Sequence, residues 1–359
     1  MHVWATAAAS LLIVVTLWDA FQTMILSRRV SRRFRPTRAF YRTLWTPWRA
    51  ATSRLPPGNR RENILMVFGP LSLLALIALW AVGLVASFAL LHWGLGSHVT
   101  APDGSSGFGV DLYMSGTTFF TLGLGDVTPR TPVARVLTVL ECGMGFAFLA
   151  LIIGYVPLIS QAFSQREVSI SMLDTSAGSP PTAAQLLRRQ YQDEDAEIRA
   201  LFRDWERWAA ELLESHVSFP ALAYFRSQHD NQSWVAALTT ILDASALVVA
   251  RIDYRPMPAA RLTFAMARHA VVDLCNVFRL TPKPPLVDRL PPSEVQRLER
   301  FFATAGVKLR TDDAAVAKFA ALRAMYEPYA QALSTFLVMP MPPWVPSEGT
   351  TSETWHTIG

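Results

Sequence analysis

The first half of the chain consists largely of long apolar runs, which are typical of helices that cross a membrane. The first run covers residues 3–26 and is interrupted only by Asp19. The second, residues 64–91, contains no charged residue and is long enough to cross a bilayer with tilt. The third covers residues 136–163 and contains Glu141. This pattern predicts three transmembrane helices.

A shorter apolar stretch, residues 111–125, lies between the second and third runs. It is too short to cross a membrane, so it is a candidate re-entrant loop. Non-helical backbone is tolerated at membrane depth only where it is buried in protein or lines a cavity. Asp111 is a suitable N-cap for a short helix that ends at Phe120. Residues 94–110 are rich in Gly and Ser and contain no Lys or Arg, as expected of an external loop.

The candidate chemistry lies directly after this short helix, in Thr121, Leu122, Gly123, Leu124, Gly125 and Asp126. A pore that strips water from K⁺ needs rings of carbonyl oxygens that point at its axis. Successive carbonyls point the same way when the backbone alternates in hand, and glycine adopts a positive φ at little cost. Gly123 and Gly125 can supply those positions, and Thr121 adds a hydroxyl group. The alternative is a glycine-containing turn between two apolar helices.

The string Thr-Leu-Gly-Leu-Gly-Asp resembles the potassium-channel selectivity filter, Thr-Val-Gly-Tyr-Gly-Asp, and some two-pore-domain members also carry Gly-Leu-Gly. The resemblance covers about residues 64–165. It implies that Thr121, Leu122, Gly123 and Leu124 supply the coordinating carbonyls. It also implies that Gly125 sets the last backbone turn of the filter and that Asp126 lies behind its outer mouth.

The likeness extends beyond the filter. Pro129 and Arg135 fall where bacterial two-helix potassium channels carry Pro and Arg, and Gly145 falls on the hinge glycine of their inner helix. The match implies an inner cavity lined by Phe146, Leu149 and Ile153. Because the family arranges four pore loops around one axis, it also implies a homotetramer. The segment LWDAFQTMIL, followed by basic residues, resembles the first helix of uncharacterised bacterial potassium-channel-family proteins with a helical tail.

Two positions depart from the family pattern. Leu124 replaces a Tyr whose hydroxyl ties the family's filter to the surrounding pore helices, and Thr117 stands where some members carry a Glu paired with the filter Asp. A weakly selective monovalent cation channel therefore stays open as an alternative to a K⁺ channel. A membrane-anchored signalling or scaffold protein with a non-conducting pore is the alternative from another class. We find no nucleophile–base set, metal cluster or phosphate loop, so we expect neither an enzyme nor a cofactor, with K⁺ as the transported ion.

The positive charge is concentrated in residues 27–62, which hold eleven Arg and one acidic residue, whereas residues 164–359 hold 20 Lys and Arg against 22 Asp and Glu. A short basic segment between two apolar runs is typical of a cytoplasmic loop that faces lipid headgroups. It predicts a cell (inner) membrane protein with its N-terminus outside and its C-terminus in the cytoplasm. Residues 37–50 mix Arg with aromatic residues, which favours a helix on the membrane surface. Nucleic acid is not an expected partner, because the C-terminal half has no positive excess.

Two carboxylates lie inside the predicted spans, where each costs at least about 2.5 kcal/mol if ionised at mid-depth. Asp19 could pair with Arg28 or Arg29, or it could sense protons. Glu141 could bond to Thr117 or Thr118 in a structural role, or it could attract cations or stabilise the filter.

The C-terminal half predicts an all-helical domain. Helical spacing begins at about residue 184, after a linker at 172–183, and recurs at 234–251, 260–279, 292–304 and 312–337. There is no glycine-rich loop after a strand, so we expect no nucleotide to bind. Cys142 and Cys275 predict no disulfide framework.

These features together predict an all-α membrane protein with a potassium-channel-like pore module. Its expected parts are an N-terminal helix with an Arg-rich linker (1–62), a pore domain (63–165), a helical cytoplasmic domain (166–343) and a loose tail (344–359).

Overall fold

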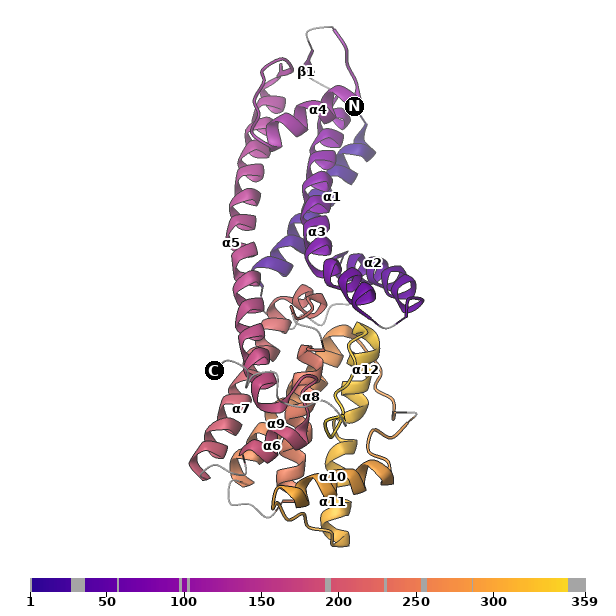
Figure 1. Cartoon of the computed structure of the whole chain (residues 1–359). Helices are drawn as coiled ribbons and strands as arrows, with labels where there is room; N and C mark the ends of the chain where they lie inside the picture. Colours follow the sequence, from indigo (N-terminus) through magenta and orange to yellow (C-terminus); the bar gives the residue numbers. More distant parts are fainter. Residues whose placement is uncertain are drawn as a thin grey trace, which may run out of the picture. The chain divides into compact units, whose positions relative to one another are not determined.

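The computed structural model describes residues 2–26, 36–56, 58–96, 99–101, 104–190, 195–228, 231–252, 257–285 and 287–347. The chain is predominantly helical, which confirms the predicted fold class (Figure 1). It divides into two compact units. The first comprises Met1–Leu55 and Val67–Gln161, and the second comprises Pro56–Met66 and Ala162–Gly359.

The first unit contains the three predicted spans. They correspond to α1 (Val3–Met24), α3 (Asn59–Gly94) and α5 (Pro132–Ala177), all long and apolar enough to cross a membrane. Helices α3 and α5 continue into the second unit at one end. The short helix α4 (Phe108–Phe119) lies between α3 and α5 in the chain (Figure 1). The segment before α4, β1 (Val99–Thr100), pairs with the segment after it, β2 (Thr128–Pro129), in a two-stranded antiparallel sheet.

Asp19 holds three elements of the first unit together. Its carboxylate accepts hydrogen bonds from the Thr37 hydroxyl (2.6 Å) and backbone N–H (3.2 Å), at the start of α2 (Pro36–Ser53). It also accepts a bond from the indole N–H of Trp80 on α3 (3.0 Å). The predicted partners Arg28 and Arg29 lie outside the described residues. The contacts of Asp19 are therefore those of a buried structural carboxylate.

Helix α2 is amphipathic, as its composition predicts. Tyr41 and Trp45 are buried on one face, and the Trp45 ring packs edge-on against Phe68 of α3 with centroids 4.7 Å apart. Arg42 lies on the exposed face. An aromatic face packed on protein and a basic face left open suit a helix at a membrane surface.

The predicted linker at 172–183 is wrong in its first half, because α5 runs on to Ala177. Ile170, Leu173 and Ala177 are spaced by one helical turn and are buried in the second unit. Burial of this stripe stabilises the helix beyond the point where Ser, Thr and Gly dominate the composition.

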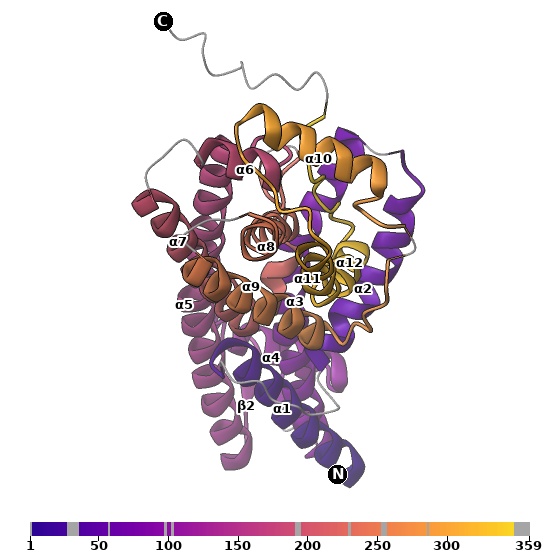
Figure 2. The same ribbon diagram turned by 90° about the horizontal axis from the view of Figure 1, so that it is seen from below.

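The second unit is a helical assembly, described from α6 (Ala183–Gln190) through α7 (Asp195–Ser218), η1 (Pro220–Tyr224), α8 (Trp234–Ala250), α9 (Met257–Phe278), α10 (Pro292–Thr304), α11 (Asp313–Ala324) and α12 (Glu327–Leu337). Every residue of α8 is buried, and Figure 2 shows this helix end-on among its neighbours. The single helix expected at 312–337 is two, α11 and α12. The apolar sequence of α8 fits this complete burial.

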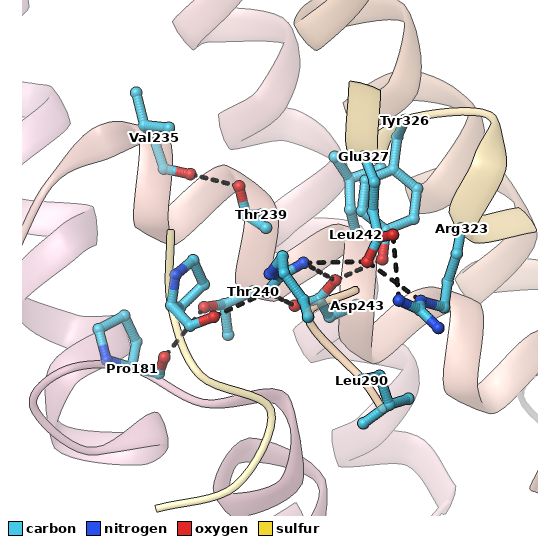
Figure 3. A network of polar contacts seen from close by, with 12 residues as sticks. Pro181, Val235, Thr239, Thr240, Leu242, Asp243, Leu290, Arg323, Tyr326 and Glu327 are labelled. Atoms are coloured by element: carbon cyan, nitrogen blue, oxygen red, sulfur yellow. Dashed lines mark hydrogen bonds and ion pairs between the residues drawn. The ribbon is translucent and has the colours of Figure 1, made fainter. Parts of the chain in front are cut away.

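A polar network lies inside this unit, beside α8 (Figure 3). The buried carboxylate of Asp243 accepts bonds from Arg289 (2.8 Å) and from the Tyr326 hydroxyl. Glu327 pairs with Arg323 at 3.0 Å. Burial and the neighbouring Asp243 carboxylate raise the pKa of Tyr326, so its hydroxyl remains a donor. Each charged group has an opposite partner, which offsets its desolvation.

The tail predicted to be loose from residue 344 is packed at its beginning. Trp344 and Val345 are buried, and the Trp344 carbonyl accepts a bond from the Ala184 N–H (3.2 Å). The guanidinium of Arg289 lies over the Trp344 ring at 5.3 Å. The apolar area that the Trp344 side chain buries is enough to order this segment, although its Pro-rich composition predicts a loose chain. Residues 348–359 lie outside the described residues.

Candidate ion-conduction pathway

Helix α4 is the predicted re-entrant helix, but it begins earlier than expected. Its N-cap is Gly107, with φ 108°, and Asp111 lies in the first turn instead of at the cap. The Asp111 side chain is fully buried. A carboxylate in the first turn interacts favourably with the helix dipole. Asp111 therefore correctly indicated the start of a helix, but the helix begins about one turn before the predicted position.

The backbone after α4 alternates between left-handed conformations with positive φ and conformations with negative φ. Thr121 has φ 57°, Gly123 has φ 57° and Gly125 has φ 77°, whereas Leu122 and Leu124 between them keep negative φ. This alternation is what aims successive carbonyl groups in one direction. The two glycines adopt these angles at little cost, but Thr121 is strained by about 1–2 kcal/mol. The sequence predicted the glycine positions and missed the left-handed threonine.

The start of this strip is bonded to the end of α4. The Leu122 N–H donates to the Thr117 carbonyl (2.8 Å), and the Thr121 N–H donates to the Thr118 carbonyl (3.0 Å). Thr117 and Thr118 therefore contact the strip through their backbones. The Thr117 hydroxyl donates to the Met114 carbonyl (3.0 Å).

The far end of the strip is held by a residue that the sequence did not single out. The Tyr113 hydroxyl of α4 donates to Asp126 Oδ2 at 2.7 Å, and Asp126 Oδ1 accepts from the Val127 N–H at 3.0 Å. Tyr113 thus provides a hydroxyl tie although Leu124 offers none. The available signal was a single Tyr on a short helix that precedes a Gly-X-Gly-Asp string.

Large apolar side chains of this region are uncovered in one chain. Leu122 and Leu124 are 63% and 64% exposed, and the predicted cavity residues Phe146, Leu149 and Ile153 are 69%, 52% and 66% exposed. On the same helix, Phe148, Tyr155 and Ile159 are buried. One face of α5 therefore packs within the chain, and the other is free to meet lipid or further copies. Gly145 is different, because it packs against the end of α4.

Glu141 of α5 is fully buried, but Thr117 and Thr118 are not its partners. His92 Nε2 of α3 lies 3.8 Å from Glu141 Oε2, and Ser115 of α4 also lies near the carboxyl group. Among the described residues, neither carboxyl oxygen has a partner at hydrogen-bonding distance. The helix phase explains the error, since Thr117 turns its hydroxyl back to its own helix.

A comparison with known protein families finds a match to this region of the chain. Residues 74–157 match the model described as ion channel. These residues form an ion-channel domain of the two-helix family. Over 242 residues the chain is 21% identical to an uncharacterised membrane protein, YdjJ, of Bacillus subtilis strain 168. That alignment covers 66% of this chain and 70% of its relative. No solved structure matches the chain. The chain is a membrane protein with an ion-channel domain, as the resemblance predicted.

Proposed function

We propose that four copies of this chain form a pore that conducts K⁺ passively across a membrane. The observation that carries the proposal is the alternating backbone of residues 121–125, with left-handed φ at Thr121, Gly123 and Gly125. A backbone of this form presents a column of carbonyl oxygens, which can replace the water around a cation of the size of K⁺. Thr121, Leu122, Gly123 and Leu124 supply that column, and Gly125 completes its last turn.

The geometry of one strip supports a homotetramer. A dehydrated cation needs oxygen on all sides, and each chain offers one strip, at residues 121–125. The exposed Leu122 and Leu124 side chains and the uncovered face of α5 supply apolar surface for association. Closed cyclic symmetry also shields the polar backbone of every strip from lipid.

Retention of K⁺ selectivity is supported by the Tyr113–Asp126 bond, which ties the outer end of the strip to α4. The Arg-rich segment after α1 supports an orientation with the N-terminus outside and the C-terminal unit in the cytoplasm. A weakly selective cation channel is the second candidate, and it is favoured by Leu124 at the family's Tyr position.

Flux measurements on the purified protein in liposomes test the proposal. Vesicles loaded with K⁺ or with Na⁺ are diluted into the opposite salt, and proton-coupled dye quenching reports the ion that leaves. We expect K⁺ efflux to exceed Na⁺ efflux, and we expect Gly123→Ala to abolish it because a Cβ is strained at φ 57°.

Gly116→Ala is the matched control. Gly116 lies inside α4, its φ is not left-handed and a Cβ there meets no atom within 4 Å. This variant should conduct like the wild type. Native mass spectrometry should show four chains for all three proteins. Absence of flux from wild-type tetramers, or unchanged flux from Gly123→Ala, would overturn the proposal.

A further inference from the structure

A short segment at the end of η1, residues 222–227, contacts the ends of both long helices of the channel domain. We call it the clamp segment. It lies wholly within the second unit, and so do the first residues of α3 and the last turns of α5. Helices α3 and α5 run from this unit into the channel domain, so the clamp segment contacts two helices that are continuous with that domain.

The clamp segment binds α5 through a buried arginine. Arg166 is 3% exposed, and its guanidinium donates to the carbonyls of Leu222 (3.1 Å) and Phe225 (2.8 Å). The next residue of α5 adds a second contact, in which the Ser227 hydroxyl donates to Glu167 (3.3 Å).

The same segment binds α3 through a second buried arginine. Arg226 pairs with Glu62 in the first turn of α3, with 2.7 Å between Nη1 and Oε2. Its other terminal nitrogen donates to the carbonyls of Leu337 (3.2 Å) and Val338 (2.6 Å), at the C-terminal end of α12. One guanidinium therefore joins α3 to α12.

Breaking any one of these buried hydrogen bonds is costly, because water cannot easily replace the lost acceptor. A guanidinium has several donors in a fixed planar fork, and each donor that loses its acceptor in a buried site is left unsatisfied. His216 packs behind Arg166, with its Nε2 3.4 Å from Arg166 Nη1. Arginine only donates, so His216 Nε2 is the acceptor, and Nδ1 donates to the Leu212 carbonyl (2.8 Å). The contact of His216 with Arg166 connects α7 to α5, and the contacts of Arg226 connect α12 to the start of α3.

We infer that the clamp segment transmits the state of the C-terminal unit to ion conduction, with Arg166 and Arg226 as positioning residues for α5 and α3. This inference rests on the proposed channel function. A ligand or partner that shifts α12 would pull on α3 through Arg226, and the shared segment would carry the displacement to α5 through Arg166.

The test uses Glu62→Gln, Arg226→Gln and the double variant in the full-length protein. Glu62→Gln removes one charge at a 37% exposed side chain and leaves the bonds of Arg226 to α12 in place, so it should fold. Hydrogen–deuterium exchange should quicken by about tenfold or more at residues 58–66 and 162–170 in all three variants. Flux in liposomes should change in the same direction in all three, and the double variant should show no further change than Arg226→Gln.

The chain offers a closely matched control pair, Arg251 and Glu299. Their separation is also 2.7 Å, their side-chain exposures are 4% and 37% against 8% and 37%, and Arg251 likewise donates to a backbone carbonyl, that of Arg310. Glu299→Gln and Arg251→Gln should alter exchange near residues 251, 299 and 310 only. Their flux should equal that of the wild type.

The outcomes separate the inference from the proposed function. Wild-type tetramers without flux would overturn the proposed function. A conducting wild type whose clamp variants show unchanged exchange at the helix ends, or unchanged flux, would overturn the inference alone. Equal effects of the Arg251 and Arg226 variants on flux would overturn it as well, because they would mark general destabilisation.

Discussion

Gly145 of α5 lies directly against the carbonyl group of Phe119, the last residue of α4. A Cβ atom added at Gly145 would stand 2.0 Å from the Phe119 oxygen and 2.8 Å from its carbonyl carbon. No side chain fits in that space. The family resemblance assigned Gly145 to a hinge, whereas its contacts assign it to the close approach of two backbones at the base of the carbonyl strip.

Gly145→Ala should therefore damage the channel domain. The added methyl group must displace backbone, which costs about 1–3 kcal/mol or more in each chain. We expect a lower melting temperature in detergent and loss of flux. Gly143→Ala, two residues away on the same helix, meets nothing within 4 Å and should be neutral. Equal melting temperatures for the two variants would contradict the packing role of Gly145.

Tyr113→Phe should loosen the outer end of the strip without unfolding the protein. The substitution removes only the hydroxyl that donates to Asp126. We expect the ratio of K⁺ to Na⁺ flux to fall while tetramers persist in native mass spectra. Tyr329→Phe, in α12, removes a hydroxyl from the C-terminal unit and serves as the control. A flux ratio that Tyr113→Phe leaves unchanged would refute a role of this bond in selectivity.

Asp19→Ala should destabilise the packing of α1 and α2 on α3. It strands the buried indole N–H of Trp80, and an unsatisfied buried donor costs about 1–3 kcal/mol. Asp19→Asn keeps an acceptor and should cost less. Ser10→Ala on the same helix removes an exposed hydroxyl that bonds within α1, so its melting temperature should match that of the wild type. If Asp19 instead sensed protons, Asp19→Asn would alter the pH dependence of flux at constant stability.

His216 should make the C-terminal unit sensitive to acid. Burial, and secondarily the neighbouring Arg166 guanidinium, lower the pKa of His216 from 6.5 to about 3. The folded state therefore holds the ring neutral where the unfolded chain binds a proton. The contribution of His216 to the free energy of unfolding is fully present above about pH 6.5. It declines by roughly 1.4 kcal/mol per pH unit as the pH falls from there towards 3.

Thermal melting between pH 7 and pH 4 measures this effect. His216→Gln should flatten the dependence over that range, even if its stability at pH 7 is lower. His269→Gln is the control, because His269 is 58% exposed on α9. An unchanged slope for His216→Gln would show that other groups cause the acid sensitivity.

Much of the architecture could be predicted from the sequence because the signals are local. Long apolar runs with at most one charged residue each predicted α1, α3 and α5, since a span needs mainly length and a low charge content. Gly123 and Gly125 revealed the left-handed positions of the strip because glycine adopts positive φ at little cost. Helical spacing predicted the bounds of α8 and α10 to within one residue and those of α9 to within three.

What the tertiary structure decided is which side chains meet. The sequence placed Asp19 and Glu141 in spans, but their neighbours Trp80 and His92 both come from α3, and the rotational phase of α3 sets the contact. The left-handed Thr121 and the packed Trp344 contradict local preference, because bonds to α4 and burial among distant helices outweigh it. Apolar length and backbone freedom are properties of a segment and can be read along the chain. A polar side chain instead takes its partner from whichever helix face packs against it, and only the assembled fold determines that face.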